Sequence, residues 1–547
     1  MSPLVARGRG AIPVMRRVVA VLPLLVACSA PPSSSTPKPK PTTGSATAPK
    51  VEPVPSKPPK LVVLVVVDQW PQWAFQQKRP HLTKGFDRLL REGDWHTGQH
   101  PSAATLTAPG HALLGTGEPT ATSGILANEW WSREAGRVIR SVEAPDGTTS
   151  AYNLRVPGLG DAIAAANTGG KAVGVSLKDR AAILPLGRAG LPIWYDKATA
   201  KFTSTKPPAW LAKLPPIRPR LDEPWTPLDA AKLAQLSGTV DDQPGEVGEK
   251  GFGKTFPHAA KKTRDPLDAV YSMPLGNELV FETALAAVDG EQLGADDVPD
   301  LLVLSLSAHD YVGHGWGHES WEAWDMTLRL DEQLGRFLDG LDTKIGRDDW
   351  AMLVTSDHGA APLPERGGGG RIAYEEIQDA ANRAAIAELG PGTWVVNAKY
   401  PNVFLARATL AQKDRDVAVN KIILALKAFP GIALAAKTAD YAGRCEQRTG
   451  EAFAICLSLD VERSGEIFYL PKRGWILEER DERLATAHGS LHAYDREVPV
   501  IMLAPGRTPH APLTAPSNTT IHMVRIATVI ARWLGVTPPS TLARQVP

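Results

Sequence analysis

The 547-residue chain is poor in cysteine, has no excess of charge of one sign, and contains no apolar run long enough to span a bilayer. Its 60 basic residues balance 59 acidic ones, so the clustered positive surplus of a nucleic-acid-binding protein is missing, and we expect no nucleic acid partner. These absences leave a large enzyme or binding protein, folded as one large domain or as two to three smaller ones.

The N-terminal segment has the pattern of an export signal. Two arginines precede the apolar run VVAVLPLLVA, which is too short for a mature transmembrane helix. Residues 25–28, LVAC, resemble the lipobox of bacterial lipoproteins, which predicts a lipoprotein signal peptide over residues 1–28 and a lipid anchor on Cys28. The alternative is an ordinary signal peptide followed by a chance cysteine. Met15 fits the start of such a signal better than Met1, and the pattern leaves that choice open.

Residues 29–60 consist almost entirely of Pro, Ser, Thr, Lys and Ala. Such a segment cannot bury enough apolar surface to fold, so we expect an extended tether. A lipid anchor followed by a stiff spacer predicts an exported catalytic domain over residues 61–547, held at a membrane in the periplasm or at the cell surface. Nothing in the sequence predicts a protein partner.

The two remaining cysteines, Cys445 and Cys456, lie in RCEQRTGEAFAIC without the spacing or the histidine neighbours of a zinc knuckle. In an exported chain, two thiols this close favour a disulfide over two free thiols. We therefore expect a local disulfide that takes no part in the chemistry.

Apolar runs alternate with amphipathic helical segments in the rest of the chain. Several runs are nearly continuously β-branched, which is typical of strands buried on both faces of a parallel sheet. The expected strands cover residues 61–67, 171–177, 301–306, 351–355 and 498–503. In EAWDMTLRLDEQLGRFLDGL, helical spacing places on one face Met326, Leu330, Leu334, Phe337 and Leu338. The alternation predicts an α/β domain with a mostly parallel central sheet and helices on both faces.

Charged or metal-binding residues follow four of these strands. Asp68 follows the first, Lys178-Asp179-Arg180 the second, SAHDYVGHGWGH the third and SDHG the fourth. A single Asp after a strand is a common turn residue. In open parallel sheets, however, ligands bind at the carboxyl ends of the strands, so four such endings predict one shared site.

The candidate metal ligands are carboxylates and imidazoles only. They are Asp68, Asp310, His314, Asp357, His358 and one histidine of HGSLH, residues 488–492. Asp310 and His314 are four positions apart, so they share one side of a helical turn or a tight loop. A set of Asp and His without thiolates suits zinc or manganese, and the imidazoles favour zinc over magnesium or calcium. The set is large enough for two ions, which could clamp the attacking and leaving oxygens of a phosphoryl transfer.

The sequence resembles the alkaline phosphatase superfamily, and most closely its phosphate-irrepressible, monoesterase-type bacterial branch, which is related to nucleotide pyrophosphatases and phosphodiesterases. The motifs that carry the resemblance appear in family order from about residue 60 to about residue 505. They are VVVDQW, TAPGH with GTG after it, ANEWW, SLKDRAAILPLG, GNELVFETALAA, SAHDYVGH, SDHGA and HGSLHAYDREVPVIMLAPG. The resemblance implies the alkaline-phosphatase-like three-layer sandwich, with additional cap or insert regions.

The resemblance also implies two zinc ions with separate ligand sets. The ligands of one ion correspond to Asp310, His314 and His488. Those of the other correspond to Asp68, Asp357 and His358, with Thr107 bridging or touching the ion. His492 is not assigned to metal.

The remaining roles in the family fall on four residues of this chain. Thr107 takes the position of the nucleophile, Asn128 that of a phosphate-oxygen ligand, and Lys178 and Arg180 that of a cationic clamp on the transition state. Thr105 lacks the x-Pro-x-His that follows Thr107 and is expected to be structural. The expected reaction is attack of the zinc-activated threonine on a phosphate monoester, followed by hydrolysis of the phosphothreonine by water.

Three other functions are compatible with parts of this pattern. A phosphodiesterase or nucleotide pyrophosphatase would use the same scaffold, but the cationic pair favours the dianion of a monoester. A non-catalytic lipoprotein that binds metal or phosphorylated ligands has no need of an intact ligand set. A sulfatase is not expected, because its nucleophile is a Cys or Ser converted to formylglycine, and this chain has Thr107, with His111 where sulfatases carry Arg.

Three features depart from the family pattern or from the main sheet. His318 lies where relatives often carry proline, so a loop near the site is expected to differ. Residues 185–275 and 363–475 are rich in Pro, Trp and Gly and are expected to form cap or insert regions outside the main sheet that shape substrate access. The sequence therefore predicts a reaction class and leaves the physiological substrate and the oligomeric state open.

Overall fold

A computed structural model describes residues 57–249, 251–504, 506 and 509–540. The predicted signal peptide, the anchor residue Cys28 and the tether up to residue 56 lie outside these ranges. Within them, no helix is both long enough and apolar enough to cross a membrane.

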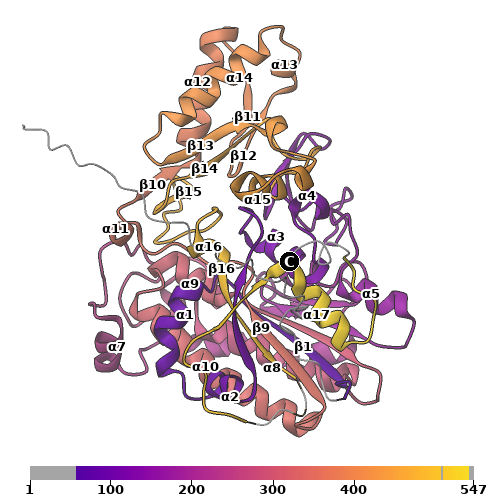
Figure 1. The fold of residues 1–547 in the computed structure, drawn as a ribbon. Helices are drawn as coiled ribbons and strands as arrows, with labels where there is room; N and C mark the ends of the chain where they lie inside the picture. Colours follow the sequence, from indigo (N-terminus) through magenta and orange to yellow (C-terminus); the bar gives the residue numbers. More distant parts are fainter. Residues whose placement is uncertain (1–56, 250, 505, 507–508, 541–547) are drawn as a thin grey trace, which may run out of the picture. The chain divides into compact units, whose positions relative to one another are not determined.

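A nine-stranded sheet with the order β17-β2-β16-β9-β1-β8-β5-β6-β7 forms the centre of the domain (Figure 1). Its strands are β1 (Leu61–Val67), β2 (Asp94–Gln99), β5 (Ala172–Ser176), β6 (Leu191–Asp196), β7 (Lys201–Thr203), β8 (Asp300–Leu306), β9 (Trp350–Thr355), β16 (Glu497–Leu503) and β17 (Ser517–His522). Only β16 and β7 run antiparallel to their neighbours in this sheet. The predicted mostly parallel sheet is confirmed.

Helices cover both faces of this sheet because its central strands are apolar on both sides. Every residue of β1 is buried, and alternate residues belong to different cores. The helices that contribute to one core are α1 (Gln72–Lys78), α2 (Gly85–Glu92), α8 (Pro274–Glu291), α9 (Ala308–Trp316) and α10 (Trp321–Lys344). Those that contribute to the other are α3 (Thr107–Thr116), α5 (Leu159–Ala166) and α17 (Ile526–Trp533). The predicted three-layer α/β architecture is confirmed, and all five residues of the predicted apolar face of α10 are buried.

Part of the segment 185–275 does not follow its prediction. Strands β6 and β7 extend the main sheet at one edge, so the expectation that this whole segment lies outside the sheet is wrong. Little in the sequence indicates strand β6, LPIWYD, because its second residue is proline and it is only partly buried. Both features suit a strand near the edge of a sheet. The rest of the segment contains α7 (Ala230–Ser237) and 3-10 turns.

A second, four-stranded sheet lies within the predicted insert 363–475 and has the order β11-β12-β14-β13 (orange, top of Figure 1). Its strands are β11 (Val395–Asn397), β12 (Asn402–Leu405), β13 (Ile432–Lys437) and β14 (Ile467–Pro471). Helices α12 (Tyr374–Leu389) and α14 (Arg415–Lys427) pack with it around a separate apolar core. A parallel pair, β10 (Gly370–Ala373) and β15 (Trp475–Glu478), joins the two ends of this region.

Short elements complete the described chain. A hairpin consists of β3 (Glu129–Ser132) and β4 (Arg137–Arg140). The short helices are α4 (Thr120–Ser123), α6 (Asp179–Ile183), α11 (Pro364–Gly367), α13 (Arg407–Leu410), α15 (Gly450–Leu457) and α16 (Ala493–Arg496).

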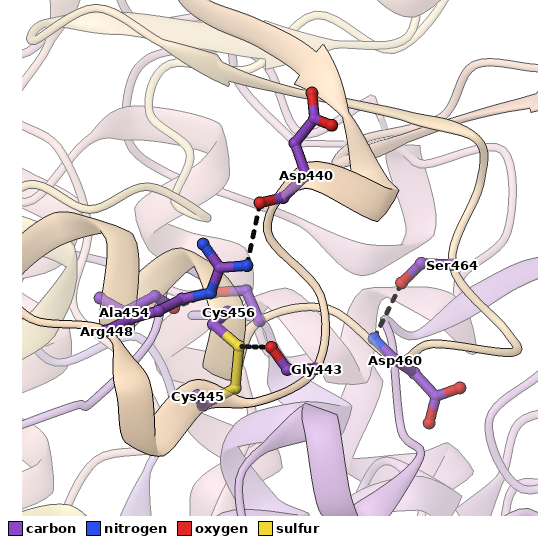
Figure 2. Close-up of a disulfide and its surroundings, with 9 residues drawn as sticks. Asp440, Gly443, Cys445, Arg448, Ala454, Cys456, Asp460 and Ser464 are labelled. Carbon is purple, nitrogen blue, oxygen red and sulfur yellow. Dashed lines mark hydrogen bonds between the residues drawn. A yellow bond between two sulfur atoms is a disulfide. The ribbon is translucent and has the colours of Figure 1, made fainter.

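The predicted disulfide between Cys445 and Cys456 is present (Figure 2). It connects a 3-10 turn to α15 within the region of the second sheet. Close to it, the guanidinium of Arg448 donates a hydrogen bond to the carbonyl of Asp440 at 2.9 Å. No candidate site residue lies in this stretch, so the disulfide is a local link, as expected.

Candidate functional site

The site lies at the carboxyl edge of the main sheet, where several chain segments converge. Strands β1, β5, β8 and β9 are parallel and end at the same edge, which places the residues after them together. Strand β2 runs in the same direction and leads into α3. Strand β16 runs the opposite way, so the segment before it, which contains His488, also lies at this edge.

Three histidines of the site are held in the same way. The Nδ1 atoms of His314, His358 and His488 lie 2.8, 3.0 and 2.7 Å from the backbone carbonyls of Thr486, Gly359 and Thr105. A carbonyl can only accept, so each Nδ1 carries the proton and each Nε2 keeps its lone pair. This tautomer, fixed by a backbone carbonyl, leaves Nε2 free to bind a metal ion.

The first group of candidate ligands contains Asp310, His314 and His488. The Nε2 atom of His314 lies 3.2 Å from Asp310 Oδ1 and 3.3 Å from His488 Nε2. His488 Nε2 lies 3.7 Å from the same carboxylate oxygen. Asp310 and His314 are one turn apart on α9, as their spacing predicts. The three donor atoms are therefore close enough to surround one ion.

The second group contains Asp68, Asp357 and His358, all fully buried. His358 Nε2 lies 3.6 Å from Asp68 Oδ1 and 3.3 Å from Asp357 Oδ2. None of these three atoms has a hydrogen-bond partner in the described part of the chain. Buried polar atoms are rarely left without a partner, so three of them facing one another fit a bound cation.

His358 also connects the two groups. Its ring stacks on that of His488 with a centroid separation of 3.7 Å, and donor atoms of Asp310, His358 and His488 lie within 4.8 Å of one another. The structure thus brings together the six predicted Asp and His ligands, while the division into two sets of three is less sharp than the sequence implied. These oxygen and imidazole donors suit a divalent transition-metal ion.

Thr107 is the first residue of α3, with an extended residue before it, and its side chain is buried. The Oδ1 atom of Asn128 accepts a hydrogen bond from the amide of Ala108 at 2.9 Å, so Asn128 lies against the first turn of this helix. The helix packs directly on the end of β9 because residue 110 is glycine. A Cβ atom on Gly110 would lie 2.3 Å from the carbonyl oxygen of Asp357.

His111 connects this first turn to the second ligand group. Its Nδ1 atom lies 2.9 Å from the carbonyl of Thr107 and 3.2 Å from Asp357 Oδ2. Its Nε2 atom lies 2.9 Å from the hydroxyl of Ser305, on β8. In the sequence, His111 served only to distinguish this chain from sulfatases. In the structure it is buried and supports the site through its contacts with Thr107, Asp357 and Ser305.

Lys178 is buried between the two ligand groups. Its Nζ atom lies 2.6 Å from Asp68 Oδ2 and 2.6 Å from Asp310 Oδ2. Burial alone would lower the pKa of Lys178, but the charges of Asp310 and Asp68 raise the pKa of Lys178 above its ordinary value. Burial raises the pKa of Asp310, and the charge of Lys178 reverses this and holds the pKa well below its usual range. The two carboxylates at 2.6 Å thus favour the charged form of Lys178.

Arg180 is close to Lys178 on α6 and is half-buried. Its neighbour Asp179 pairs with Arg140 at 2.7 Å, and the Nε atom of Arg180 has no hydrogen-bond partner in the described residues. Charges on Asp68 and Asp310 are among those that affect the pKa of Arg180 and raise it, against the effect of burial. Arg180 thus lies within electrostatic range of the two carboxylates that Lys178 contacts.

Thr105 and His492 are predicted to take no part in metal binding or catalysis. Thr105 holds the loop of His488 through its carbonyl, and its hydroxyl donates to the carbonyl of Ser490 at 3.3 Å, in agreement with a structural role. The Nε2 atom of His492 lies 3.2 Å from the carbonyl of Pro471, and His492 belongs to neither ligand group.

Residues 62–495 match the protein family described as type I phosphodiesterase / nucleotide pyrophosphatase. The chain is 30% identical over 524 residues to alkaline phosphatase PafA of Elizabethkingia meningoseptica, which covers 88% of this chain and 92% of the relative. It is 35% identical over 333 residues to alkaline phosphatase PhoV of Synechococcus elongatus, which covers 56% of this chain and 60% of PhoV.

The solved structure of wild-type PafA superposes on this chain with a TM-score of 0.77 and 27% sequence identity, over 88% of this chain and 97% of that one. A solved variant of PafA, in which a threonine is replaced by serine and an asparagine, a lysine and an arginine by alanine, is equally similar. In that variant, the substituted threonine and asparagine are 21 positions apart and the lysine and arginine two positions apart. The same residue types in this chain, Thr107 with Asn128 and Lys178 with Arg180, have the same separations.

Proposed function

The chain belongs to the type I phosphodiesterase / nucleotide pyrophosphatase family of the alkaline phosphatase superfamily and is a hydrolase of phosphoesters, and we propose that it cleaves phosphate monoesters as an alkaline phosphatase. The observation that carries this proposal is the buried ammonium of Lys178, which lies between two candidate metal-ligand groups with Arg180 close by. A monoester dianion carries one more negative charge than a diester, so a buried cation attracts the monoester more strongly.

We propose that the two ligand groups hold two zinc ions. The donor atoms are imidazole nitrogens and carboxylate oxygens, and the three facing atoms of the second group have no hydrogen-bond partner among the residues that the structure describes. Two zinc ions held there would supply Lewis acidity to the nucleophile and to the leaving oxygen.

Thr107 serves in this proposal as the nucleophile. Its position at the first residue of α3 places the hydroxyl where backbone amides and the helix dipole favour negative charge. The threonine oxygen forms a bond to phosphorus as the bond from phosphorus to the ester oxygen breaks, and the alcohol leaves. Water then attacks the phosphothreonine, which releases phosphate and restores the hydroxyl.

Asn128 and the two cations hold the phosphoryl group in place. The Oδ1 atom of Asn128 already accepts from Ala108, so the side-chain NH₂ is the part that remains to donate to a phosphoryl oxygen. Lys178 and Arg180 donate to the other nonbridging oxygens as charge shifts in the transition state. The equal separations of these residue types in the substituted PafA variant support the assignment.

The second candidate function is a phosphodiesterase or nucleotide pyrophosphatase on the same scaffold, because the matching family is described by those activities. Hydrolysis of an aryl phosphate monoester and of the matching bis-aryl diester by the purified full-length protein separates the two. We expect a higher kcat/KM for the monoester. A strong preference for the diester would overturn the monoesterase proposal and leave the hydrolase.

The nucleophile is tested with Thr107→Ala, with Thr122→Ala as the control because Thr122 is an exposed threonine of the short helix α4. We expect Thr107→Ala to abolish turnover while its zinc content stays near two ions per chain, and Thr122→Ala to behave as wild type. Substantial turnover by Thr107→Ala contradicts the nucleophile assignment. A wild-type chain without zinc contradicts the metal assignment.

We also propose that the chain is exported and anchored through a lipid on Cys28, with residues 29–60 as the tether. Incorporation of a labelled fatty acid by growing cells, lost in Cys28→Ser, tests the anchor. Label retained in that variant rules out Cys28 as its site.

A further inference from the structure

Gln69 has a backbone conformation that few residues other than glycine adopt. It directly follows Asp68 at the end of β1, is completely buried, and has a φ of 57° in the left-handed region. This conformation turns its backbone N–H toward Asp357 Oδ1, at 3.2 Å. An unusual backbone conformation at a buried polar residue beside candidate metal ligands suggests a role in placing them.

The side chain of Gln69 extends to the other ligand group. Its Nε2 atom lies 2.7 Å from Asp310 Oδ1 and 3.1 Å from His314 Nε2. A single residue therefore donates to one carboxylate of each group, through its backbone to Asp357 and through its side chain to Asp310. Hydrogen bonds to a ligating carboxylate hold its orientation and tune how tightly an ion is bound.

His318 fixes the orientation of the Gln69 amide. The Nε2 atom of His318 lies 2.9 Å from Gln69 Oε1, while its Nδ1 atom has no partner in the described residues. The proton is therefore on Nε2 and donates to the amide oxygen, which turns the NH₂ group toward Asp310. The imidazole is held in turn by stacking on His309, with ring centroids 5.3 Å apart.

The helix that carries Asp310 leaves room for this amide. A Cβ atom on Gly313 of α9 would lie 2.0 Å from Gln69 Oε1 and 3.0 Å from His318 Nε2. Any larger residue at this position would displace the amide from both partners. The glycine, the left-handed turn and the histidine thus all favour one placement of Gln69.

We propose that Gln69, oriented by His318, is a positioning residue that sets the carboxylates of both candidate metal groups. The proposal rests on the zinc centre of the proposed function. It goes beyond that function because it gives His318, which takes no part in the proposed reaction, a role in supporting the centre. Loss of such a supporting hydrogen bond costs about 10- to 100-fold in metal affinity.

The test is the zinc affinity of the purified full-length protein, measured by competition with chelators, which requires no substrate. Gln69→Met keeps the length of the side chain and removes both polar groups. We expect one of the two ions to bind about 10- to 100-fold more weakly, while the other changes less because the backbone N–H still contacts Asp357. Excess zinc is expected to restore the activity of this variant.

Gln72→Met is the matched control, because Gln72 is a buried glutamine three positions away whose amide atoms have no hydrogen-bond partner in the described residues. His318→Phe keeps a flat ring and removes the donor, so we expect it to weaken the same ion. In the Gln69→Met background, His318→Phe should add little, since it acts through the amide.

Equal zinc affinity in Gln69→Met and wild type, with two ions bound by each, would overturn this inference and leave the proposed function intact. An equal loss in Gln72→Met would assign the effect to general packing and overturn it as well. Full additivity of the two substitutions would refute the action of His318 through Gln69. A wild-type chain that binds fewer than two ions would instead overturn the zinc centre itself, and this proposal with it.

Discussion

Replacing Lys178 with methionine tests how the charges of the site balance one another. The Lys178 side chain is 2% exposed, and its ammonium nitrogen lies 2.6 Å from a carboxylate oxygen of each ligand group. Methionine has a similar length and no charge, so the substitution leaves Asp68 and Asp310 buried with their main counter-charge removed. Removing one partner of a buried ion pair costs about 3 to 5 kcal/mol.

This cost is expected in the zinc-free protein and not in the zinc-loaded one. The two proposed zinc ions would neutralise the same carboxylates, so the loaded variant should lose only about 1 kcal/mol or less of its unfolding free energy. Zinc therefore stabilises the variant more than it stabilises wild type. The measurement is urea unfolding of wild type and Lys178→Met, each after chelation and after zinc loading.

Lys171→Met is the control, because Lys171 is an exposed lysine near the opposite end of β5 whose ammonium contacts the carbonyl of Glu291. We expect Lys171→Met to unfold like wild type with and without zinc. A loss of stability in Lys178→Met that is the same with and without zinc would refute the reasoning. The loaded variant should also lose about 100- to 1,000-fold in kcat on a monoester and less on a diester, because in the proposed function Lys178 would contact a charged oxygen that the diester lacks.

Two further substitutions test the packing of α3 and the effect of a buried acid outside the site. Gly110→Ala would put a Cβ atom 2.3 Å from the carbonyl oxygen of Asp357, so we expect a loss of about 1 to 3 kcal/mol in unfolding free energy and weaker zinc binding. Gly367→Ala is the control and should change neither quantity, because the nearest atom to its new Cβ would be 3.6 Å away. Wild-type zinc affinity in Gly110→Ala would contradict this packing. Burial and the charge of Glu322 raise the pKa of Glu246 to about 9, so above about pH 4.5 the folded state binds more protons than the unfolded state, and wild type should lose stability as the pH rises toward about 9. Glu246→Gln should flatten this slope in urea unfolding between pH 5 and 9, and the exposed Glu223→Gln should not; an unchanged slope in Glu246→Gln would refute the effect of this acid.

The sequence was sufficient to predict the strands that end in the site. The run LVVLVVV is apolar at every position and LLVLSL at every position except Ser305, which is typical of strands covered on both faces, and the polar residue after each run marks the carboxyl end of the strand. Parallel neighbours then bring Asp68 and Asp310 together without any knowledge of side-chain packing. The same argument failed for β6, whose half-exposed residues carry no such pattern.

The directions of strands and side chains could not be predicted in this way. A buried apolar strand reads the same in either direction, so VPVIML gave no indication that β16 is antiparallel, although this is what brings His488 to the site. The tautomers of the three histidines depend on carbonyls of Thr105, Gly359 and Thr486, which are remote or unremarkable in sequence. The contacts of Gln69 with Asp310 and of His111 with Asp357 could not be predicted for the same reason, because these partners lie hundreds of positions away.

The region of the second sheet also takes part in the geometry of the site. Lys399, just after β11, lies 2.5 Å from a carboxylate oxygen of Glu129, which directly follows Asn128. The next residue, Tyr400, donates its hydroxyl to the carbonyl of Gly489, which directly follows His488. Two consecutive residues thus contact the chain next to the proposed phosphate ligand and next to a proposed metal ligand. Because both contacts come from one short connection between β11 and β12, a shift of the second sheet would move Asn128 and His488 together.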